Sequence, residues 1–187
     1  MNKYRVLASK EIFKGHAVRL HVDTFAMPDG HKTTREIVEH VPVVAIVAVD
    51  AENNVLMVQQ YREAVQQELL EIPAGGIEPG EDIETAVKRE MQEETGFLPQ
   101  KLVKLCSFYA APGYCTEFMH VFLATELTPR RLVAEDTDEI SLVKVPVKDI
   151  PGLLRSGTLA DAKTIAGLYA YLDYLKTCTN PETIRFH

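Results

Sequence analysis

The chain of 187 residues contains no tryptophan, only three cysteines and no long run of apolar residues. A bilayer-spanning helix needs about 20 consecutive apolar residues, so the sequence predicts none. The first residues, MNKYRVLASKEIFKG, are too polar for a secretory signal peptide. Cys106, Cys115 and Cys178 are odd in number and far apart, which fits neither a disulfide framework nor a tetrahedral zinc site. These absences indicate a reducing compartment and predict a cytoplasmic protein.

Positive charge is scarce as well, because 20 lysines and arginines face 27 aspartates and glutamates, which leaves a net charge of −7. Nucleic acids and membrane surfaces are anionic, so an acidic chain is a poor partner for either. We therefore expect no binding to nucleic acid or to membranes. A small phosphate ester is still a suitable ligand if metal ions supply the positive charge. The hydrophobic share of 46% suffices for a substantial core, and the length suits one domain with or without an appendage.

Apolar patterns divide the chain into a short β-rich start and a longer region that mixes strands and helices. Residues 1–41 alternate apolar and polar side chains over 17–25 and contain a turn at 28–30, which predicts a small antiparallel β meander. The almost continuous apolar run at 41–49 predicts a strand covered on both faces. Within the second region, 42–187, the patterns predict strands near 55–60, 69–72, 102–109, 118–126 and 140–145 and helices near 83–95 and 161–176. This order predicts the α/β class, with a mixed sheet between helices.

The clearest chemical pattern lies in residues 75–97, GGIEPGEDIETAVKREMQEETGF. A buried stripe at helical spacing comprises Ile83, Ala86, Val87 and Met91. Glu90 and Glu94 fall within this stripe, whereas a solvated helix carries its carboxylates on the opposite face. Burying carboxylates side by side is costly unless positive charge neutralises them, and Arg89 is one cation against four glutamates. A hard divalent cation with oxygen ligands meets this requirement, and Mg²⁺ fits such a set.

The spacing also indicates how four glutamates share a metal. Glu90 and Glu94 are one helical turn apart and can hold one ion together. Glu93 approaches the same cluster from the side, and Glu81 can fold back from the preceding loop. Metal ions neutralise the charge that develops during phosphoanhydride hydrolysis, activate a water and orient its attack. The alternative is an acidic surface helix supported by i,i+4 ion pairs, which is disfavoured because the acidic face coincides with the apolar one.

The same residues resemble the signature of the Nudix hydrolases, G-x5-E-x7-R-E-U-x-E-E-x-G-U, where U is a bulky apolar residue. Its slots are filled in order by Gly75, Glu81, Arg89, Glu90, Met91, Glu93, Glu94, Gly96 and Phe97. The resemblance implies a Nudix-type α/β/α sandwich over about residues 42–176. It also implies a metal-dependent pyrophosphohydrolase.

Roles for individual residues follow from this resemblance. The implied ligands of Mg²⁺, or of Mn²⁺, are the carbonyl of Ala74 and the carboxylates of Glu81, Glu90, Glu93 and Glu94. The residues implied to be structural are Gly75, Arg89 and Gly96. Arginine pairs with a carboxylate of the signature, a loop glycine lets the backbone approach the metal, and the last glycine ends the helix.

Four segments outside the signature resemble the ADP-ribose pyrophosphatase branch of this family. They are QQYR at 59–62, EIPAG at 71–75, APG at 111–113 followed by Glu117, and DAKT at 161–164, although serine is common in the branch where Ala111 stands. The branch implies hydrolysis of ADP-ribose, or of a related nucleoside diphosphate sugar, to AMP and ribose 5-phosphate. It also implies a homodimer joined through residues 1–41. The implied substrate contacts are Arg62, Glu71, Pro112, Gly113 and Glu117. A surface ion pair of Arg62 and a simple turn at Pro112 and Gly113 are the alternatives.

The sequence leaves the identity of the general base open. The loop before residue 140 is acidic and contains Glu135, Asp136, Asp138 and Glu139. A solvated turn is one interpretation, but in the branch that the chain resembles a loop at this point supplies the catalytic carboxylate. Glu139 is the first candidate, followed by Asp138 and Asp136. Glu93 in the helix is the next candidate if the loop has no catalytic role.

Two other functions stay open at this point. One is a Nudix hydrolase of another nucleoside diphosphate sugar or of an oxidised nucleotide. The other is a non-catalytic sensor that binds ADP-ribose, which the intact signature disfavours. A panel of substrates with Mg²⁺ and with Mn²⁺ distinguishes these functions.

Overall fold

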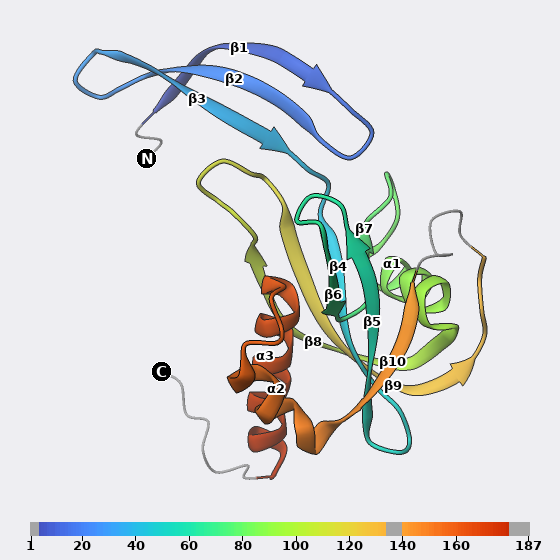
Figure 1. Ribbon diagram of the computed structural model, residues 1–187. Helices are drawn as coiled ribbons and strands as arrows, with labels where there is room; N and C mark the ends of the chain where they lie inside the picture. Colours follow the sequence, from blue (N-terminus) through green and yellow to red (C-terminus); the bar gives the residue numbers. More distant parts are fainter. Residues whose placement is uncertain (1–3, 134–139, 180–187) are drawn as a thin grey trace. The chain divides into compact units, whose positions relative to one another are not determined.

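The computed structural model describes residues 4–133 and 140–179 of the chain. It contains two compact units (Figure 1). The first unit joins Met1–Pro42 with Phe108–Phe118, and the second joins Val43–Ser107 with Met119–His187. The segment Phe108–Phe118 is therefore far in sequence from the rest of its unit. The division into a dimerisation domain at 1–41 and a hydrolase domain at 42–187 stays a prediction.

The first unit is built on a three-stranded antiparallel sheet with the order β1-β2-β3 (Figure 1). Its strands are β1 (Arg5–Lys14), β2 (Arg19–Ala26) and β3 (Lys32–Glu39). The turn between β2 and β3 contains Gly30 at a φ of 90°, which favours glycine, and the predicted antiparallel meander is confirmed. The tip of a later hairpin joins this sheet. The Val38 N–H donates to the Tyr114 carbonyl at 2.7 Å, and the Thr116 N–H donates to the Val38 carbonyl at 2.9 Å.

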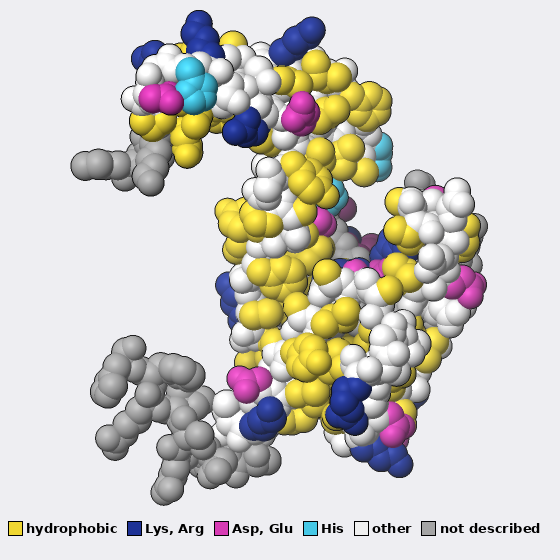
Figure 2. All heavy atoms as spheres, turned by 60° about the vertical axis from the view of Figure 1, so that its left-hand side comes forward, with side chains coloured by type: hydrophobic (Ala, Val, Ile, Leu, Met, Phe, Trp, Pro, Cys, Tyr) yellow, Lys and Arg dark blue, Asp and Glu magenta, His cyan; other side chains and the backbone are white. Residues whose placement is uncertain are grey.

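The three-stranded sheet leaves much of its own apolar surface uncovered. Every position of β1 is exposed, and its exposed large apolar side chains are Val6, Leu7, Ile12 and Phe13. Hydrophobic side chains are visible on the surface of this sheet in Figure 2. None of the described residues of the first unit belongs to the buried hydrophobic core of the protein. A unit of this kind is too small to be stabilised by its own core.

The second unit is organised around a seven-stranded mixed sheet with the main order β10-β5-β4-β9-β8. β4 (Val43–Val49) is buried at every position, as its apolar run predicts. It pairs in parallel with β9 (Phe118–Pro129) and antiparallel with β5 (Asn54–Arg62) and β7 (Ala74–Gly76). The remaining strands are β6 (Gln67–Glu71), β8 (Phe97–Tyr109) and β10 (Ser141–Pro146).

Helices cover both faces of this sheet, which confirms the predicted α/β/α sandwich (Figure 1). On one face, α1 (Ile83–Glu90) packs in a common core cluster with Val44 and Ile46 of β4. On the other face lies α3 (Ala162–Thr179), where a Cβ added at Gly167 would be 3.4 Å from the side chain of Val47. A 3₁₀ turn, η2 (Val147–Asp149), and a short helix, α2 (Ile150–Ser156), also form, and the sequence did not indicate them. Within the described ranges, no helix has the length and apolar character needed to cross a membrane.

The helix that carries the glutamates has well-defined ends. The carboxylate of Asp82 caps its start by accepting hydrogen bonds from the N–H groups of Glu84 at 3.0 Å and Thr85 at 3.1 Å. Gly96, at a φ of 79°, ends it as predicted. The last turn, η1 (Met91–Thr95), is π-helical, which the sequence pattern did not predict. A π turn holds one residue more than an α turn, so it changes the direction in which Glu94 points.

Candidate active site

A close approach between β7 and α1 places a glycine against a carboxylate. Gly75 pairs with Val44 in the sheet, and Glu90 is the last residue of α1. A Cβ added at Gly75 would lie 2.0 Å from Oε1 and 2.3 Å from Oε2 of Glu90. No side chain fits in that space. The structure thus supplies a steric reason for the structural role that was predicted for Gly75.

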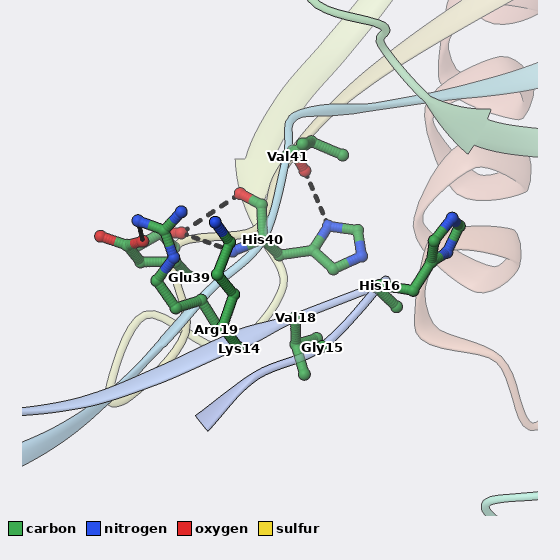
Figure 3. A pocket seen from close by; sticks show the side chains of 10 residues that line it. Lys14, Gly15, His16, Val18, Arg19, Glu39, His40 and Val41 are labelled. Carbon is green, nitrogen blue, oxygen red and sulfur yellow. Dashed lines mark hydrogen bonds and ion pairs between the residues drawn. The ribbon is translucent and has the colours of Figure 1, made fainter. Parts of the chain in front are cut away.

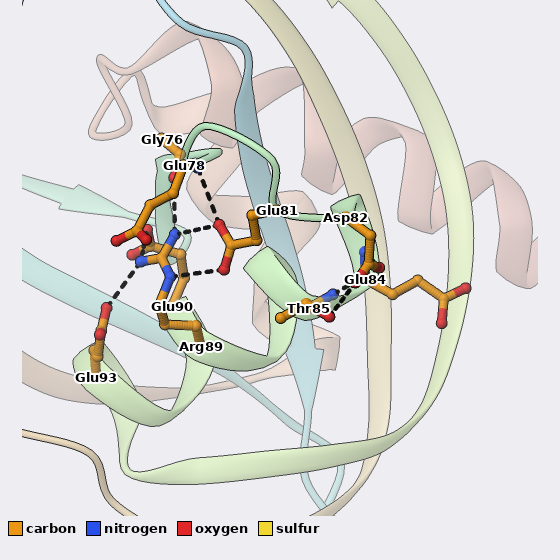
Figure 4. A network of polar contacts seen from close by, with 9 residues as sticks. All are labelled: Gly76, Glu78, Glu81, Asp82, Glu84, Thr85, Arg89, Glu90 and Glu93. Atoms are coloured by element: carbon orange, nitrogen blue, oxygen red, sulfur yellow. Dashed lines mark hydrogen bonds and ion pairs between the residues drawn. The ribbon is translucent and has the colours of Figure 1, made fainter.

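Arg89 is the centre of the polar network in Figure 4. Its Nε and Nη2 donate to the two carboxylate oxygens of Glu81 at 2.9 and 3.0 Å. Its Nη1 donates to Oε1 of Glu90 at 2.7 Å and to Oε2 of Glu93 at 3.1 Å. Nη2 also donates to the Gly76 carbonyl at 2.8 Å, so the donors of the guanidinium are fully used. Arg89 therefore contacts three of the four glutamates, more than the sequence alone indicates for a single arginine.

Glu94 is the fourth glutamate of the signature and is not a partner of Arg89. Its Oε2 accepts a hydrogen bond from the Ala74 N–H at 3.1 Å. Burial, together with the negative charge of Glu90, raises the pKa of Glu94 to about 8. Burial also raises the pKa of Glu90. These two neighbouring carboxyls lack sufficient positive charge, a condition that a bound divalent cation relieves.

The chemistry of this pair suits a hard cation. Glu90, which is buried, and Glu94, which is half-buried, offer carboxylate oxygens, which are the donors that Mg²⁺ prefers. Among residues 4–133 and 140–179, no three His, Cys, Asp or Glu side chains are already gathered as a metal site. Arg89 engages Glu81, Glu93 and also Oε1 of Glu90, but burial still raises the pKa of Glu90 despite this partner. The residues present therefore fit a divalent cation at Glu90 and Glu94 first, with the other two glutamates close to the same arginine.

Arg62 and Glu71, two of the predicted substrate residues, form a bidentate ion pair in the second unit. Nε and Nη2 of Arg62 donate to the two oxygens of Glu71 at 2.8 and 2.7 Å. The Glu71 side chain is 2% exposed, whereas that of Arg62 is 39% exposed. Burial raises the pKa of Glu71, but Arg62 and Lys163 outweigh it and the pKa is lowered overall. The alternative interpretation of Arg62 was a surface ion pair. Arg62 does form an ion pair, but its partner Glu71 is buried and orients the guanidinium.

The other predicted substrate residues, Pro112, Gly113 and Glu117, belong to the first unit. They lie in the connection between β8 and β9, where a hydrogen bond of 2.9 Å from the Cys115 N–H to the Ala111 carbonyl closes a turn that contains Pro112 and Gly113 and precedes Glu117. The predicted turn is therefore present. Contact of these residues with a substrate stays a prediction.

The candidate base residues of the acidic loop, Glu135, Asp136, Asp138 and Glu139, lie outside the described residues. Their roles stay predictions. Glu93, the candidate within the helix, is half-buried, and its Oε2 accepts the hydrogen bond from Arg89.

A buried lysine beside Glu71 was not among the predicted site residues. Lys163 lies in the first turn of α3, is 8% exposed and donates hydrogen bonds to Glu71 and, at 3.0 Å, to Asp161. The sequence signal was the DAKT segment, in which an aspartate that can cap a helix precedes a lysine beside an apolar stripe. Glu71 is 92 positions away, so no local pattern could show this pairing.

A separate cavity of about 470 Å³ lies in the first unit (Figure 3). At its wall, Arg19 lies 3.3 Å from Glu39, and Nδ1 of His40 lies 2.7 Å from the Val41 carbonyl. No residue of the 75–97 segment lines it. The lining residues are Lys14, Gly15, His16, Ala17, Val18, Arg19, Glu39, His40, Val41 and Thr116.

Comparison with known proteins gives one family and several relatives. The NUDIX domain family matches residues 39–168. An ADP-ribose pyrophosphatase of Bacillus subtilis (strain 168) is 40% identical over 162 residues, which cover 86% of this chain and 88% of that protein. A methanol dehydrogenase activator of Bacillus methanolicus is 34% identical, with the same coverage of 86% and 88%. A GDP-mannose pyrophosphatase of Yersinia pestis (strain Pestoides F) is 29% identical, with coverage of 94% and 93%.

A solved structure agrees with the fold described above. The crystal structure of an ADP compounds hydrolase superposes with a TM-score of 0.86 at 22% sequence identity. The match covers 95% of this chain and 97% of that one, so both units have counterparts in it. At this level of identity the likeness concerns the fold alone.

Proposed function

The chain belongs to the Nudix family, and we propose that this hydrolase cleaves the pyrophosphate bond of ADP-ribose, or of a related nucleoside diphosphate sugar, to AMP and ribose 5-phosphate. The observation that carries the proposal is the pair of neighbouring carboxyls, Glu90 and Glu94, packed against Ala74 and Gly75 of β7. The relative at 40% identity is an ADP-ribose pyrophosphatase, which supports this substrate. A GDP-mannose pyrophosphatase among the relatives supports the wider class of nucleoside diphosphate sugars as the alternative.

Glu90 and Glu94 would hold the divalent cation, Mg²⁺ or Mn²⁺. When bound, the cation supplies neutralisation of phosphate charge and activation of water. Gly75 leaves room for the Glu90 carboxylate, and Arg89 orients it. The Ala74 N–H orients Glu94. By the family resemblance, the Ala74 carbonyl would be a further ligand.

The remaining residues bind the substrate and move a proton. Arg62 would bind the anionic phosphates through N–H groups that Glu71 does not use. A water oxygen forms a bond to one phosphorus of the pyrophosphate, and the bridging P–O bond to the same phosphorus breaks. A carboxylate accepts the proton of that water, and Glu139 is the first candidate for this role, before Asp138 and Asp136. Glu93 replaces them if the acidic loop takes no part.

We also propose that the protein is a homodimer joined through residues 1–41. The support is β1, a strand exposed at every position that carries four large apolar side chains. In a closed two-fold dimer each of these surfaces would meet the other subunit reciprocally. Such contacts would remove from water the apolar area that the first unit cannot bury by itself.

A substrate panel tests the proposed reaction. ADP-ribose, GDP-mannose and a nucleoside triphosphate are incubated with Mg²⁺, with Mn²⁺ or with chelator, and the products are identified by mass. We expect equal amounts of AMP and ribose 5-phosphate from ADP-ribose, and none in chelator. A Glu94→Gln protein prepared in parallel shows whether a contaminating hydrolase is present. Binding of ADP-ribose without turnover would favour the sensor function, and a clear preference for the triphosphate would overturn the proposed substrate.

A further inference from the structure

A buried cluster of charges joins β6 to the first turn of α3. Lys163 Nζ donates to Glu71 and, at 3.0 Å, to Oδ2 of Asp161. Glu71 accepts Nε and Nη2 of Arg62 at 2.8 and 2.7 Å. Glu71 and Lys163 are both buried, and the cluster contains two cations and two carboxylates. The charges therefore balance in an interior where an unpaired charge is costly.

Stability alone does not explain this cluster. Apolar residues of similar volume often replace a buried ion pair with no loss of stability. The cluster also extends from the interior to the surface, because the side chains of Lys163 and Glu71 are 9% and 2% exposed, whereas that of Arg62 is 39% exposed. Glu71 uses one edge of the guanidinium, and Nη1 of Arg62 has no hydrogen bond to any residue in the described part of the chain. Arg62 therefore presents oriented, unused donors at the accessible end.

The same turn of α3 is connected to the loop that precedes the signature. Oδ2 of Asp161 accepts the Thr164 N–H at 2.9 Å and the Thr164 hydroxyl at 2.5 Å. That hydroxyl in turn accepts the Ile72 N–H at 2.9 Å. Two residues further on, the Ala74 N–H donates to Glu94 at 3.1 Å. The start of α3 thus supports the short segment that leads to the proposed cation site.

We infer that Lys163 is a positioning residue of this hydrolase, whose ammonium balances Glu71 so that Glu71 holds Arg62 with donors free for an anionic pyrophosphate. The inference rests on the proposed function for the nature of the substrate. Without Lys163, Arg62 would be the one cation beside Glu71 and Asp161, and the cluster would carry a net charge of about −1. That charge would repel an anionic substrate and draw Arg62 toward the interior.

Lys163→Met tests this role, because methionine removes the charge and keeps a similar length. We expect KM to rise by about tenfold to a hundredfold, the range for losing an oriented charged hydrogen bond. We expect kcat to fall by less than about threefold, since the lost contact acts on binding. Lys148→Met is the matched control, because Lys148 is an exposed lysine on η2, and its KM should equal that of the wild type.

The double variant Lys163→Met with Glu71→Gln keeps the test valid if the single variant folds poorly. It leaves Arg62 and Asp161 as a balanced pair, so its melting temperature should exceed that of the single variant. KM should stay raised, because a neutral amide holds Arg62 less firmly than a carboxylate does.

All KM values are measured with whichever of ADP-ribose and GDP-mannose the wild type hydrolyses, so an error in the proposed substrate does not decide the role of Lys163. An unchanged KM in folded Lys163→Met, or a wild-type KM in the double variant, would overturn the inference. A merely structural role would lower the melting temperature and the active fraction, and hence kcat, without a change in KM.

Discussion

Gly75→Ala is a small change for which the structure predicts a large effect. The new methyl group would lie 2.0 Å from Oε1 and 2.1 Å from Cδ of Glu90, although contacts of a Cβ below 3.0 Å are essentially never seen. Either group must move by about 1 Å, which is the difference between 3.0 and 2.0 Å. Gly75 is fixed by its pairing with Val44 in the sheet, so the Glu90 side chain is the part that moves.

Two losses follow from that movement. Glu90 leaves Nη1 of Arg89, now 2.7 Å away, and a hydrogen bond between charged groups contributes about 1.5–3 kcal/mol. The unfolding temperature should therefore fall by several degrees. The proposed cation ligand is also displaced, and a misplacement of about 1 Å reduces the rate by a factor on the order of 10². We expect a loss of that size in kcat, together with a higher Mg²⁺ requirement.

Steady-state hydrolysis of ADP-ribose over a Mg²⁺ titration measures both effects, and thermal unfolding measures the loss of stability. Gly152→Ala in α2 is the matched control, because a Cβ there meets nothing within 4 Å. Its activity should be unchanged, and its stability equal or slightly greater, since alanine restricts the unfolded chain. A Gly75→Ala protein with wild-type kcat and wild-type Mg²⁺ dependence would refute the placement of Glu90 at the reaction centre.

Four further predictions concern the same chemistry and the first unit. Glu94→Gln should lower kcat by a factor on the order of 10³ with an unchanged circular dichroism spectrum, and near-normal turnover would exclude Glu94 as a ligand. Glu139→Gln should reduce kcat far more than KM, since a base acts in the transition state; a large loss in Asp136→Asn or Asp138→Asn instead would identify the base there. The pKa of Glu94 is raised to about 8, so between about pH 4.5 and 8 the Glu94 carboxyl is protonated in the folded state and ionised in the unfolded state. The unfolding free energy in chelator should therefore fall over this interval by up to about 1 kcal/mol per pH unit. Mg²⁺ should restore stability at pH 8, and a metal-free melting temperature that rises over this interval would contradict the assignment. Deleting residues 1–41 should give monomers or insoluble protein and weaken ADP-ribose binding more than metal binding; a full-length protein that sediments as a fully active monomer would exclude the dimer.

Local signals explain the elements that could be predicted from the sequence. β4 is apolar at every position because both of its faces are covered, and that composition is visible without a structure. The glutamate helix has a capping aspartate before it, Asp82, and a glycine with positive φ after it, Gly96, so its limits follow from residue chemistry. The spacing of the glutamates along this helix was likewise enough to identify the candidate cation site.

Partners that are distant in sequence explain what could not be predicted. α2 begins at Ile150 and continues with Pro151 and Gly152, two residues of low helix propensity, and the proline is tolerated because it lies in the first turn. Lys163 meets Glu71 across 92 positions, and Arg89 reaches Glu81 because the loop between β7 and α1 folds back over the helix. Neither the contact of Lys163 with Glu71 nor that of Arg89 with Glu81 follows a sequence periodicity that a pattern could detect.

The first unit is assembled from two segments of the chain, 1–42 and 108–118, and the ribosome synthesises the first segment well before the second. The three-stranded sheet emerges first, but the His40 N–H bonds to Oγ1 of Thr116, which is made 76 residues later. At about 5–20 residues per second, that delay lasts about 4–15 s. During this time the outer edge of β3 lacks its bridge from Val38 to Cys115 and is open to a chaperone or to the edge strand of another nascent chain. Translation speed across the intervening residues therefore decides how long this half-finished sheet is at risk of mispairing.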